Sequence, residues 1–261
     1  MSELDGFTPE ELDLAFKQRD FLLAIEHARK YRKRDSFFLA TGPFRREFYA
    51  KHCHFFAAGG QHIPLPECPP DCTGASHRER CLLAANRTGK TVAAAYEVTA
   101  HATGLYPEWW PGRRFDGPIL CWVANDTSTN TKDINQRELL GPPGGEQGLG
   151  MLPADCIMRT TPRPGIPDAV ESIFVKHATG GISTIQFKSY EQGWEKFTGG
   201  AVHVIWCDEE PDVKVYTECC IRTMTTNGLI LLTFTPLQGV TEVVRGYIDS
   251  YKVKDTANAS T

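Results

Sequence analysis

Continuous apolar runs, separated by helical or turn-rich stretches, dominate the sequence from Cys81 onward. Six of them predict strands: CLLAA (81–85), PILCWVA (118–124), VESIFVKH (170–177), STIQFKSY (183–190), VHVIWC (202–207) and LILLTF (229–234). Several show little alternation of apolar and polar positions, which is typical of strands whose two faces are both covered by helices. The third and fourth runs, joined by ATGG, predict an antiparallel hairpin instead. The pattern therefore predicts an α/β fold with a mostly parallel central sheet flanked by helices.

The N-terminal part of the chain has helical periodicity and no strand-like run. The stretch TPEELDLAFKQRDFLLAIEHARKYRKR (8–34) predicts an amphipathic helix that the polar residues 17–20 could interrupt. A second helix is predicted at FRREFYAKHCHFFAAGG (44–60), ended by its two glycines, before a Pro- and Gly-rich stretch that cannot continue it. We divide the chain into an N-terminal helical lid or linker subdomain (1–76), a core (77–250) and a tail (251–261).

Charge and composition narrow the function classes. A formal net charge of -4 excludes a protein that coats nucleic acid through an overall basic surface, so any DNA contact must be local. No apolar run approaches the ~20 residues of a membrane span, and the acidic N-terminus is unlike a signal peptide, so we expect a cytoplasmic protein with no membrane partner. Nine cysteines, with irregular spacing around His52, His54, Cys68 and Cys72, favour reduced thiols over a disulfide framework or a zinc site.

The segment AANRTGKT (84–91) stands between the first apolar run and an alanine-rich helix. A phosphate loop needs a strand, a tight turn and a helix whose N-terminus points at the anion. Lys90 can reach the β and γ phosphates, Thr91 can ligate Mg²⁺ through its hydroxyl, and Gly89 lets the backbone approach closely. Ala84 replaces the first glycine of the G-x-x-x-x-G-K-[ST] pattern, which loosens the match without removing a chemical group. The predicted nucleotide-binding residues are Ala85, Asn86, Arg87, Thr88, Gly89, Lys90 and Thr91.

Two further strand ends carry candidate chemistry. Asp208 and Glu209 follow VHVIWC, at the edge of the sheet where an open α/β fold binds its ligand. Asp208 is predicted to hold Mg²⁺ through water or through Thr91, and Glu209 to polarise the attacking water as a general base. The strand LILLTF leads to Thr233 and Thr235, whose hydroxyls could contact that water or the γ-phosphate. Each motif alone could be an ordinary strand end, and their order and spacing together favour a nucleotide hydrolase.

These motifs, together with IQFKSYEQGWEKFTGGAVHVIWCDEEP and YTECCIRTMTTNGLILLTFTPLQG, resemble the large terminase subunit of tailed bacteriophages, the ATP-driven motor that packs DNA into the capsid. The resemblance covers roughly residues 80–239. It implies a P-loop NTPase of the ASCE type, with residues 84–91 as the Walker A segment, Asp208 and Glu209 at the end of Walker B, and residues 233–236 as the coupling motif. Thr233 and Thr235 are the coupling residues in this interpretation.

The resemblance also implies roles for arginines. Arg87 is the candidate for an arginine within the phosphate loop that touches the γ-phosphate in cis. Ring motors also use an arginine from the neighbouring subunit, and Arg222, Arg163 and Arg159 are the candidates, among which the sequence does not choose.

The implied activity is Mg²⁺-dependent hydrolysis of ATP to translocate double-stranded DNA into the procapsid. The implied partners are the portal protein, the small terminase subunit and further copies of the chain. The resemblance implies a ring of five copies on the portal and a monomeric chain in isolation. The implied location is the host cell cytoplasm. Too few residues follow Thr235 for a second core, so we expect the nuclease domain of the family to be absent.

Two other functions stay open: a helicase-like translocase, and an ATP-gated assembly module with little turnover of its own. Glu209 separates the second from a motor, because a pure binding switch needs no general base.

Aromatic residues near these motifs have two expected roles. Trp109 and Trp110 are predicted to anchor a loop to the core. Adenine recognition is expected between the chain before Arg80 and the helix that ends near Phe56, with an aromatic side chain or Gln61 at the base.

Overall fold

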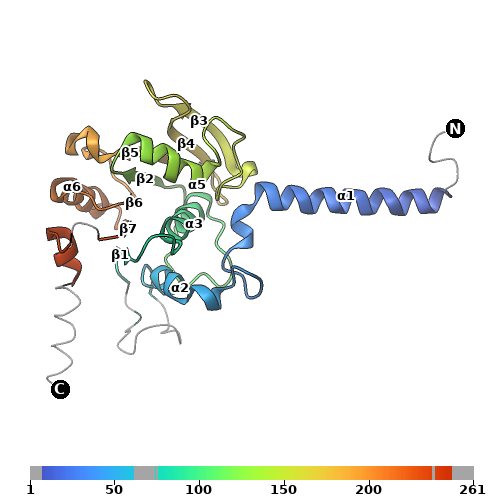
Figure 1. The fold of residues 1–261 in the computed structure, drawn as a ribbon, viewed down its shortest axis with the longest axis horizontal. Coiled ribbons are helices and arrows are strands. Elements are labelled where there is room, and N and C mark those ends of the chain that lie inside the picture. Colours follow the sequence, from blue (N-terminus) through green and yellow to red (C-terminus); the bar gives the residue numbers. More distant parts are fainter. Residues whose placement is uncertain (1–7, 62–73, 75, 237–238, 249–261) are drawn as a thin grey trace, which may run out of the picture.

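A seven-stranded sheet lies between two layers of helices in the computed structural model, which describes residues 8–61, 74, 76–236 and 239–248 (Figure 1). The strands are β1 (Glu79–Leu83), β2 (Leu120–Asn125), β3 (Ile157–Pro162), β4 (Val170–Lys176), β5 (Ile182–Ser189), β6 (Val204–Asp208) and β7 (Leu229–Phe234). Their order in the sheet is β1-β7-β6-β2-β5-β4-β3. Pairing is parallel from β1 through to β5 and antiparallel at β5-β4 and β4-β3. The predicted mixed α/β fold, its mostly parallel sheet and the β4-β5 hairpin are confirmed.

The helices are α1 (Pro9–Tyr31), α2 (Ala50–Ala57), α3 (Lys90–Thr103), α4 (Ser128–Asn130), α5 (Arg137–Leu140) and α6 (Val213–Met224). A π-helical turn, Thr131–Gln136, joins α4 to α5, and residues 242–248 are also helical. Short 3-10 segments occupy Lys33–Ser36, Arg46–Tyr49, Ala154–Cys156, Tyr190–Gln192 and Trp194–Phe197. The apolar pattern missed β3, because this edge strand is mostly exposed and lacks a continuous apolar run.

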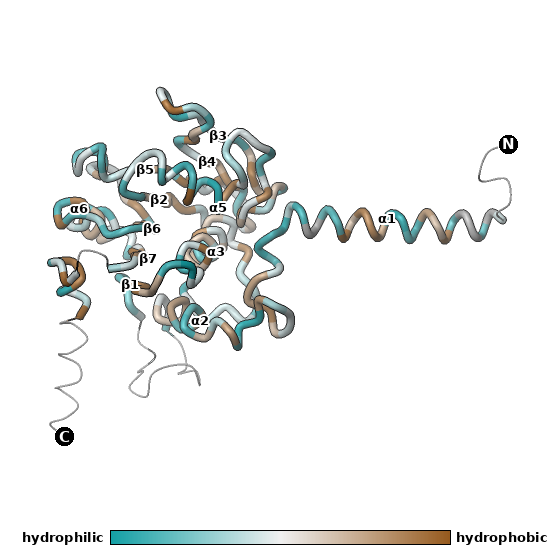
Figure 2. The backbone as a smooth tube through the Cα atoms, viewed as in Figure 1, coloured by the Kyte–Doolittle hydropathy of each residue, from teal (hydrophilic) through white to brown (hydrophobic). Residues whose placement is uncertain are grey.

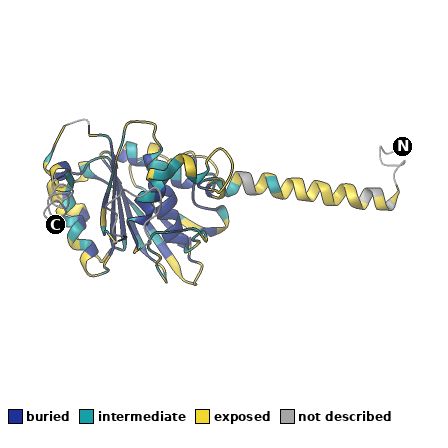
Figure 3. Cartoon of the chain, turned by 90° about the horizontal axis from the view of Figure 1, so that it is seen from below, coloured by how far each residue is buried: buried dark blue, intermediate teal, exposed yellow. Residues whose placement is uncertain are grey.

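Both faces of the central parallel strands β2, β6 and β7 are buried, as their unbroken apolar runs predict. In β6, Val204 and Trp206 pack in the core with α3, whereas Ile205 and Cys207 pack in a second core with α6. All six residues of β7 are buried as well. Figure 3 shows the dark strands enclosed between helices whose outer surfaces are exposed. This double cover leaves the strand ends as the places where the parallel part of the sheet can present chemistry.

Helix α1 differs from the predicted amphipathic helix, because it runs unbroken through residues 17–20 and projects from the body of the molecule (Figure 1). Lys17 and Asp13, one turn apart, form an ion pair of 2.7 Å, which stabilises the helix where the break was expected. Apolar side chains such as Leu14 and Phe21, exposed by 58% and 66%, occur along the helix (Figure 2). It therefore buries little apolar surface against the described part of this chain.

A buried polar network fixes α3 to β1 and α2. The Arg80 guanidinium on β1 donates to the carboxylate of Glu97 on α3 at 2.6 and 3.2 Å, and also to the carbonyl of Phe55 on α2. His101 bonds Glu97 at 3.2 Å through Nε2 and the Tyr106 hydroxyl at 2.9 Å through Nδ1. Because α3 begins at the predicted phosphate loop, this network sets where that loop stands.

The predicted end of the second helix is confirmed, and its physical reason is close packing. The ideal Cβ position on Gly59 lies 2.6 Å from the Arg80 guanidinium carbon, and that on Gly60 lies 2.6 Å from the main chain of Arg113. A side chain at either position would displace these groups. Phe55 and Phe56 on α2 belong to the same core as α3 and the sheet, so α2 shares the core of the sheet. The division at residue 76 stays a prediction.

Candidate active site

The loop between β1 and α3 turns sharply into the helix. Gly89 has φ = +85° and Arg87 has φ = +63°, both in the left-handed region. Gly89 is the residue that precedes α3, and no side chain caps the helix there. The N–H groups of its first turn are thus left for an anion, and the left-handed backbone at Gly89 explains why the sequence has glycine there.

Lys90 is folded back onto this loop. Its side chain is buried, and Nζ donates to the carbonyls of Ala84 at 2.9 Å and Ala85 at 2.8 Å and to the Thr235 hydroxyl at 3.0 Å. These three acceptors account for the three N–H donors of an ammonium group. The lysine is therefore held at the loop by three hydrogen-bond acceptors. A phosphate oxygen could take the place of any one of them.

Strand β7 connects the loop to the acidic strand end. It lies between β1 and β6 in the sheet. Just beyond it, the Thr235 hydroxyl oxygen lies 2.9 Å from the Ala84 carbonyl oxygen and 2.9 Å from Asn86 Oδ1. The hydroxyl has one proton, so it donates to one of these two acceptors at a time. Two residues earlier, the Thr233 hydroxyl donates to Asp208 at 2.7 Å. One strand thus serves both the lysine and the carboxylate.

Asp208 is almost fully buried, at 4% exposure, and is held by side chains from three other elements. Oδ1 accepts from Thr233, while Oδ2 accepts from Asn135 at 3.0 Å and from Thr91 at 3.4 Å. Trp206 donates at 2.7 Å to the same Thr233 hydroxyl, which leaves that hydroxyl's own proton for Asp208. Burial raises the pKa of Asp208 to about 6, and the bond from Thr233 opposes that rise.

Glu209 stands beside Asp208 in a constrained conformation. Its φ of +72° is unusual for a non-glycine residue, and such strain is concentrated at functional sites. The main chain is pinned on both sides, since its N–H donates to the Thr233 carbonyl at 3.0 Å and its carbonyl accepts from the Tyr190 hydroxyl at 2.9 Å. Burial, followed by the charge of Asp126, raises the pKa of the Glu209 carboxyl, while Lys90 opposes the rise.

The geometry brings the predicted phosphate and acidic motifs together. Thr91 and Asp208 are 117 residues apart in the sequence, and their side-chain oxygens are 3.4 Å apart. A hydroxyl and a carboxylate are the hard oxygen donors that suit Mg²⁺, which usually takes one or two protein ligands and completes its shell with phosphates and water. The described residues contain no cluster of three or more His, Cys, Asp and Glu side chains placed to hold a metal ion. The donor set therefore fits a magnesium ion shared with a phosphate ligand.

Of the four predicted arginines, Arg87 belongs to the phosphate loop and the other three lie on other parts of the chain. Arg87 is exposed on the loop itself. Arg159 stacks its guanidinium 3.5 Å from the ring centre of Phe174, and both it and Arg163 belong to the β3 end of the sheet, opposite β1. Arg222 pairs with Glu218 at 3.3 Å, near the start of β6. Within one chain these three arginines are remote from the phosphate loop, and any contact with a nucleotide would have to be made across subunits.

The expected region of adenine recognition stays a prediction. Phe56 is fully buried and packs its ring 4.9 Å from that of Trp110, so it offers no face to a base; Trp110 does anchor its loop to the core, as predicted. Gln61 is exposed. The side chain from α2 that reaches the loop is His52, whose Nε2 lies 3.5 Å from the ideal Cβ position on Gly89.

Sequence reasoning missed several side chains of the site. Asn135 and Tyr190 contact the acidic pair, Asp126 acts on it through its charge, and Trp206 bonds Thr233, yet none of the four was assigned a role from the sequence. The one available signal was that Asp126 also follows an apolar strand. The possible zinc ligands Cys68 and Cys72 lie outside the described residues. None of the cysteines in the described ranges forms a disulfide.

Known proteins resemble this chain over most of its length. A family model described as "Terminase large subunit, T4likevirus-type, N-terminal" matches residues 81–260. The terminase large subunit of Salmonella phage P22 is 34% identical over 194 residues, which are 67% of this chain and 39% of the relative. The large terminase of a thermophilic bacteriophage aligns in structure with a TM-score of 0.43 and 9% identity, over 73% of this chain and 39% of the other. The chain thus spans about two fifths of the length of the curated relative. Among the helices that the structure describes, none combines the length and apolar character needed to cross a bilayer.

Proposed function

The chain belongs to the family of phage terminase large subunits, and from that premise we propose that it is the Mg²⁺-dependent ATPase of a DNA-packaging motor, with a P-loop fold of the ASCE type. One observation carries the proposal: the Lys90 loop and the Asp208-Glu209 pair meet at one edge of the sheet, through the contact of Thr91 with Asp208. β7 lies between β1 and β6, so the strand that leads to Thr233 and Thr235 stands between the two nucleotide motifs.

The residues divide the work of hydrolysis. Lys90 and the first turn of α3 bind the phosphates, while Thr91 and Asp208 hold Mg²⁺. Bound magnesium neutralises charge on the phosphate oxygens. Glu209 orients the attacking water and accepts its proton, and its raised pKa suits a base that works near neutral pH. Thr233 and Thr235 join the two motifs and are the candidates for passing the state of the site to the rest of β7.

The motor role extends this site to partners. We propose that the chain acts in a ring of copies in the host cell cytoplasm, with double-stranded DNA, the portal protein and the small terminase subunit as partners. Arg222, Arg163 and Arg159 are the candidates for an arginine supplied across subunits, since all three are remote from the loop of their own chain. Arg87, exposed on the loop, is the candidate in cis.

Steady-state ATP hydrolysis with Mg²⁺, measured over a wide range of protein concentrations, tests the proposal. Turnover per subunit is expected to rise with concentration, because an arginine supplied in trans is worth about 10³ to 10⁵ in rate. Flat, near-zero turnover at every concentration, despite measurable nucleotide binding, would favour the ATP-gated assembly module. Separation of DNA strands by this chain would favour the helicase-like translocase.

A further inference from the structure

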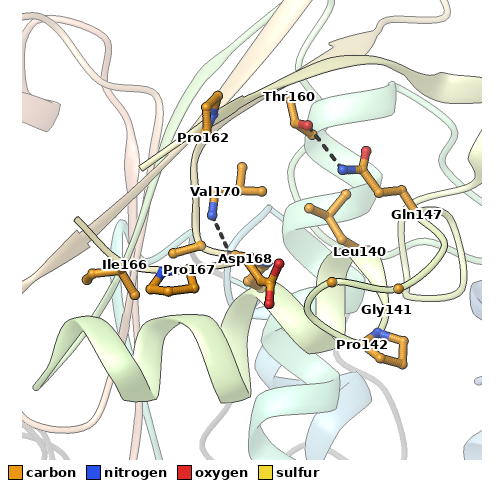
Figure 4. Close-up of a pocket in the computed structure, with 14 residues that line it drawn as sticks. Leu140, Gly141, Pro142, Gln147, Thr160, Pro162, Ile166, Pro167, Asp168 and Val170 are labelled. Carbon is orange, nitrogen blue, oxygen red and sulfur yellow. Dashed lines mark hydrogen bonds between the residues drawn. The ribbon is translucent and has the colours of Figure 1, made fainter. Parts of the chain in front are cut away.

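The helical segment that follows β2 in the chain, and that borders the cavity of Figure 4 through Gln136, contains a π-helical turn, Thr131–Gln136. Such turns are rare and frequently lie at functional sites, because the extra residue redirects a side chain. Asn135 lies in this turn and is fully buried. The contacts of the Asn135 side chain therefore indicate what the turn is for.

Asn135 faces the carboxylate of Asp208. Its Nδ2 donates to Asp208 Oδ2 at 3.0 Å, and its Oδ1 accepts from Asn125 Nδ2 at 2.9 Å. Asn125 is itself oriented, because its Oδ1 accepts from the Asp126 N–H at 2.7 Å. An amide whose oxygen is already bound to a donor must turn its NH₂ group the other way. The chain of bonds thus fixes the Asn135 donor toward Asp208.

Asn135 is the closer of the two partners of Asp208 Oδ2. The other is the Thr91 hydroxyl, at 3.4 Å. In the proposed function a lone pair of the Thr91 oxygen faces the metal, and its proton stays available to Asp208, so this longer bond involves a group that also binds the ion. Asn135 holds Oδ2 from outside the metal site, through the shorter bond.

The π turn holds Asn135 firmly because its neighbours are tied to other elements. Gln136 donates to the Asp168 carbonyl at 2.8 Å and accepts from the Val170 N–H at 2.8 Å, on the wall of a cavity of about 470 Å³ (Figure 4). The Thr131 hydroxyl lies within hydrogen-bond distance of the Lys188 carbonyl, at 3.0 Å. Asn135 and Gln136 are consecutive residues that bond to different parts of the molecule. Asn135 bonds Asp208, and Gln136 bonds the main chain at the start of β4.

We propose that Asn135 is a positioning residue for Asp208, which sets the affinity of the site for Mg²⁺ without touching the ion or the nucleotide. The proposal rests on the proposed function. Partners that orient a metal-binding carboxylate typically contribute about 10-fold to 100-fold in metal affinity or activity. Loss of Asn135 should therefore weaken the Mg²⁺-dependent part of nucleotide binding and leave the metal-free part, which Lys90 and its loop supply, unchanged.

The test is a titration of Mg²⁺ against the binding of a fluorescent ADP analogue to wild type, Asn135→Leu and Gln136→Leu. Asn135→Leu is close to the size of asparagine but cannot donate to Asp208. Gln136→Leu is the matched control, because it removes two bonds from the same π turn and none from Asp208. Circular dichroism checks the fold, and Asn135→Ser replaces Asn135→Leu if the leucine variant does not fold.

We expect Asn135→Leu to need about 10-fold to 100-fold more Mg²⁺ for half-saturation, with metal-free binding as in wild type and less than about threefold change in Gln136→Leu. An unchanged Mg²⁺ requirement in Asn135→Leu would overturn the inference alone. An equal rise in Gln136→Leu would overturn it as well, since the effect would then come from the turn. Absence of nucleotide binding in wild type would overturn the proposed function, and this inference with it.

Discussion

The two halves of the candidate active site are built in different ways. The lysine half, residues 84–90 with Thr235, holds Lys90 mainly through carbonyls five and six residues away in the same loop. The carboxylate half, Asp208 and Glu209 with their neighbours, is held by side chains 25, 73 and 117 residues away. A local loop can retain its shape when distant residues change, whereas the carboxylate depends on how three other elements pack. Substitutions in the lysine half should therefore alter nucleotide binding, and those in the carboxylate half should alter metal dependence and turnover.

The largest effect on binding is expected from Lys90→Ala. Removal of a hydrogen-bonded charge partner costs about 2 kcal/mol or more, which weakens nucleotide affinity by at least about 30-fold. Isothermal titration calorimetry with ADP measures the change, and Lys51→Ala, exposed on α2, is the matched control. Equal affinity in Lys90→Ala and wild type would mean that the loop does not bind the phosphates.

Thr233→Val should break the carboxylate half. The variant removes a donor to Asp208 and leaves the buried Trp206 N–H without its acceptor. We expect turnover to fall by about 10-fold to 100-fold, as for other groups that orient metal-binding carboxylates, with nucleotide affinity in the absence of metal close to wild type. Thr223→Val, equally buried on α6, controls for general loss of stability. A loss of metal-free binding would contradict the separation of the two halves.

Thr235→Val should act on the other half, although it lies only two residues further along. Its hydroxyl accepts from Lys90 and lies within hydrogen-bond distance of Asn86 in the loop. Loss of a net hydrogen bond of about 0.5–1.5 kcal/mol predicts nucleotide binding weaker by roughly twofold to tenfold. The measurement is the same calorimetry in the absence of metal. If Thr235→Val instead raised the Mg²⁺ requirement as Thr233→Val does, the two threonines would not divide between the halves.

The same difference explains what the sequence could predict. The loop around Gly89 and Lys90 and the positions of six of the seven strands along the chain follow from local patterns, because apolar runs and phosphate motifs depend on neighbouring residues. Asn135 could not be found this way, since its role comes from a π turn that brings it to Asp208. Tyr190 shows the same limit, since its hydroxyl reaches the Glu209 carbonyl from 19 residues away. Tertiary packing decides both cases.

The smallest effect concerns the buried polar network that fixes α3, the helix that follows the phosphate loop. Burial lowers the pKa of His101 below its ordinary 6.5, even though Glu97 opposes the shift; Arg80 and Arg113 also lower it. The unfolded chain therefore takes up a proton near pH 6.5 that the folded chain does not, so stability is full above this pH and falls as the pH decreases below it. Each such proton changes the free energy of unfolding by about 1.4 kcal/mol per pH unit.

Urea unfolding at pH 7.5 and 5.5 measures this slope. His101→Gln should lose the part of the pH dependence that comes from one proton. The same slope in His101→Gln and wild type would show that His101 does not titrate between the folded and unfolded states.

The most direct test of the account measures binding and hydrolysis of ATP side by side in Glu209→Gln and Lys90→Ala. We predict a crossed result: Glu209→Gln binds nucleotide as wild type does but loses turnover by about 10² to 10⁴, the usual contribution of a general base, whereas Lys90→Ala loses binding. Wild-type turnover in Glu209→Gln, or loss of binding in both variants alike, would contradict the division of the site into a half that binds and a half that hydrolyses.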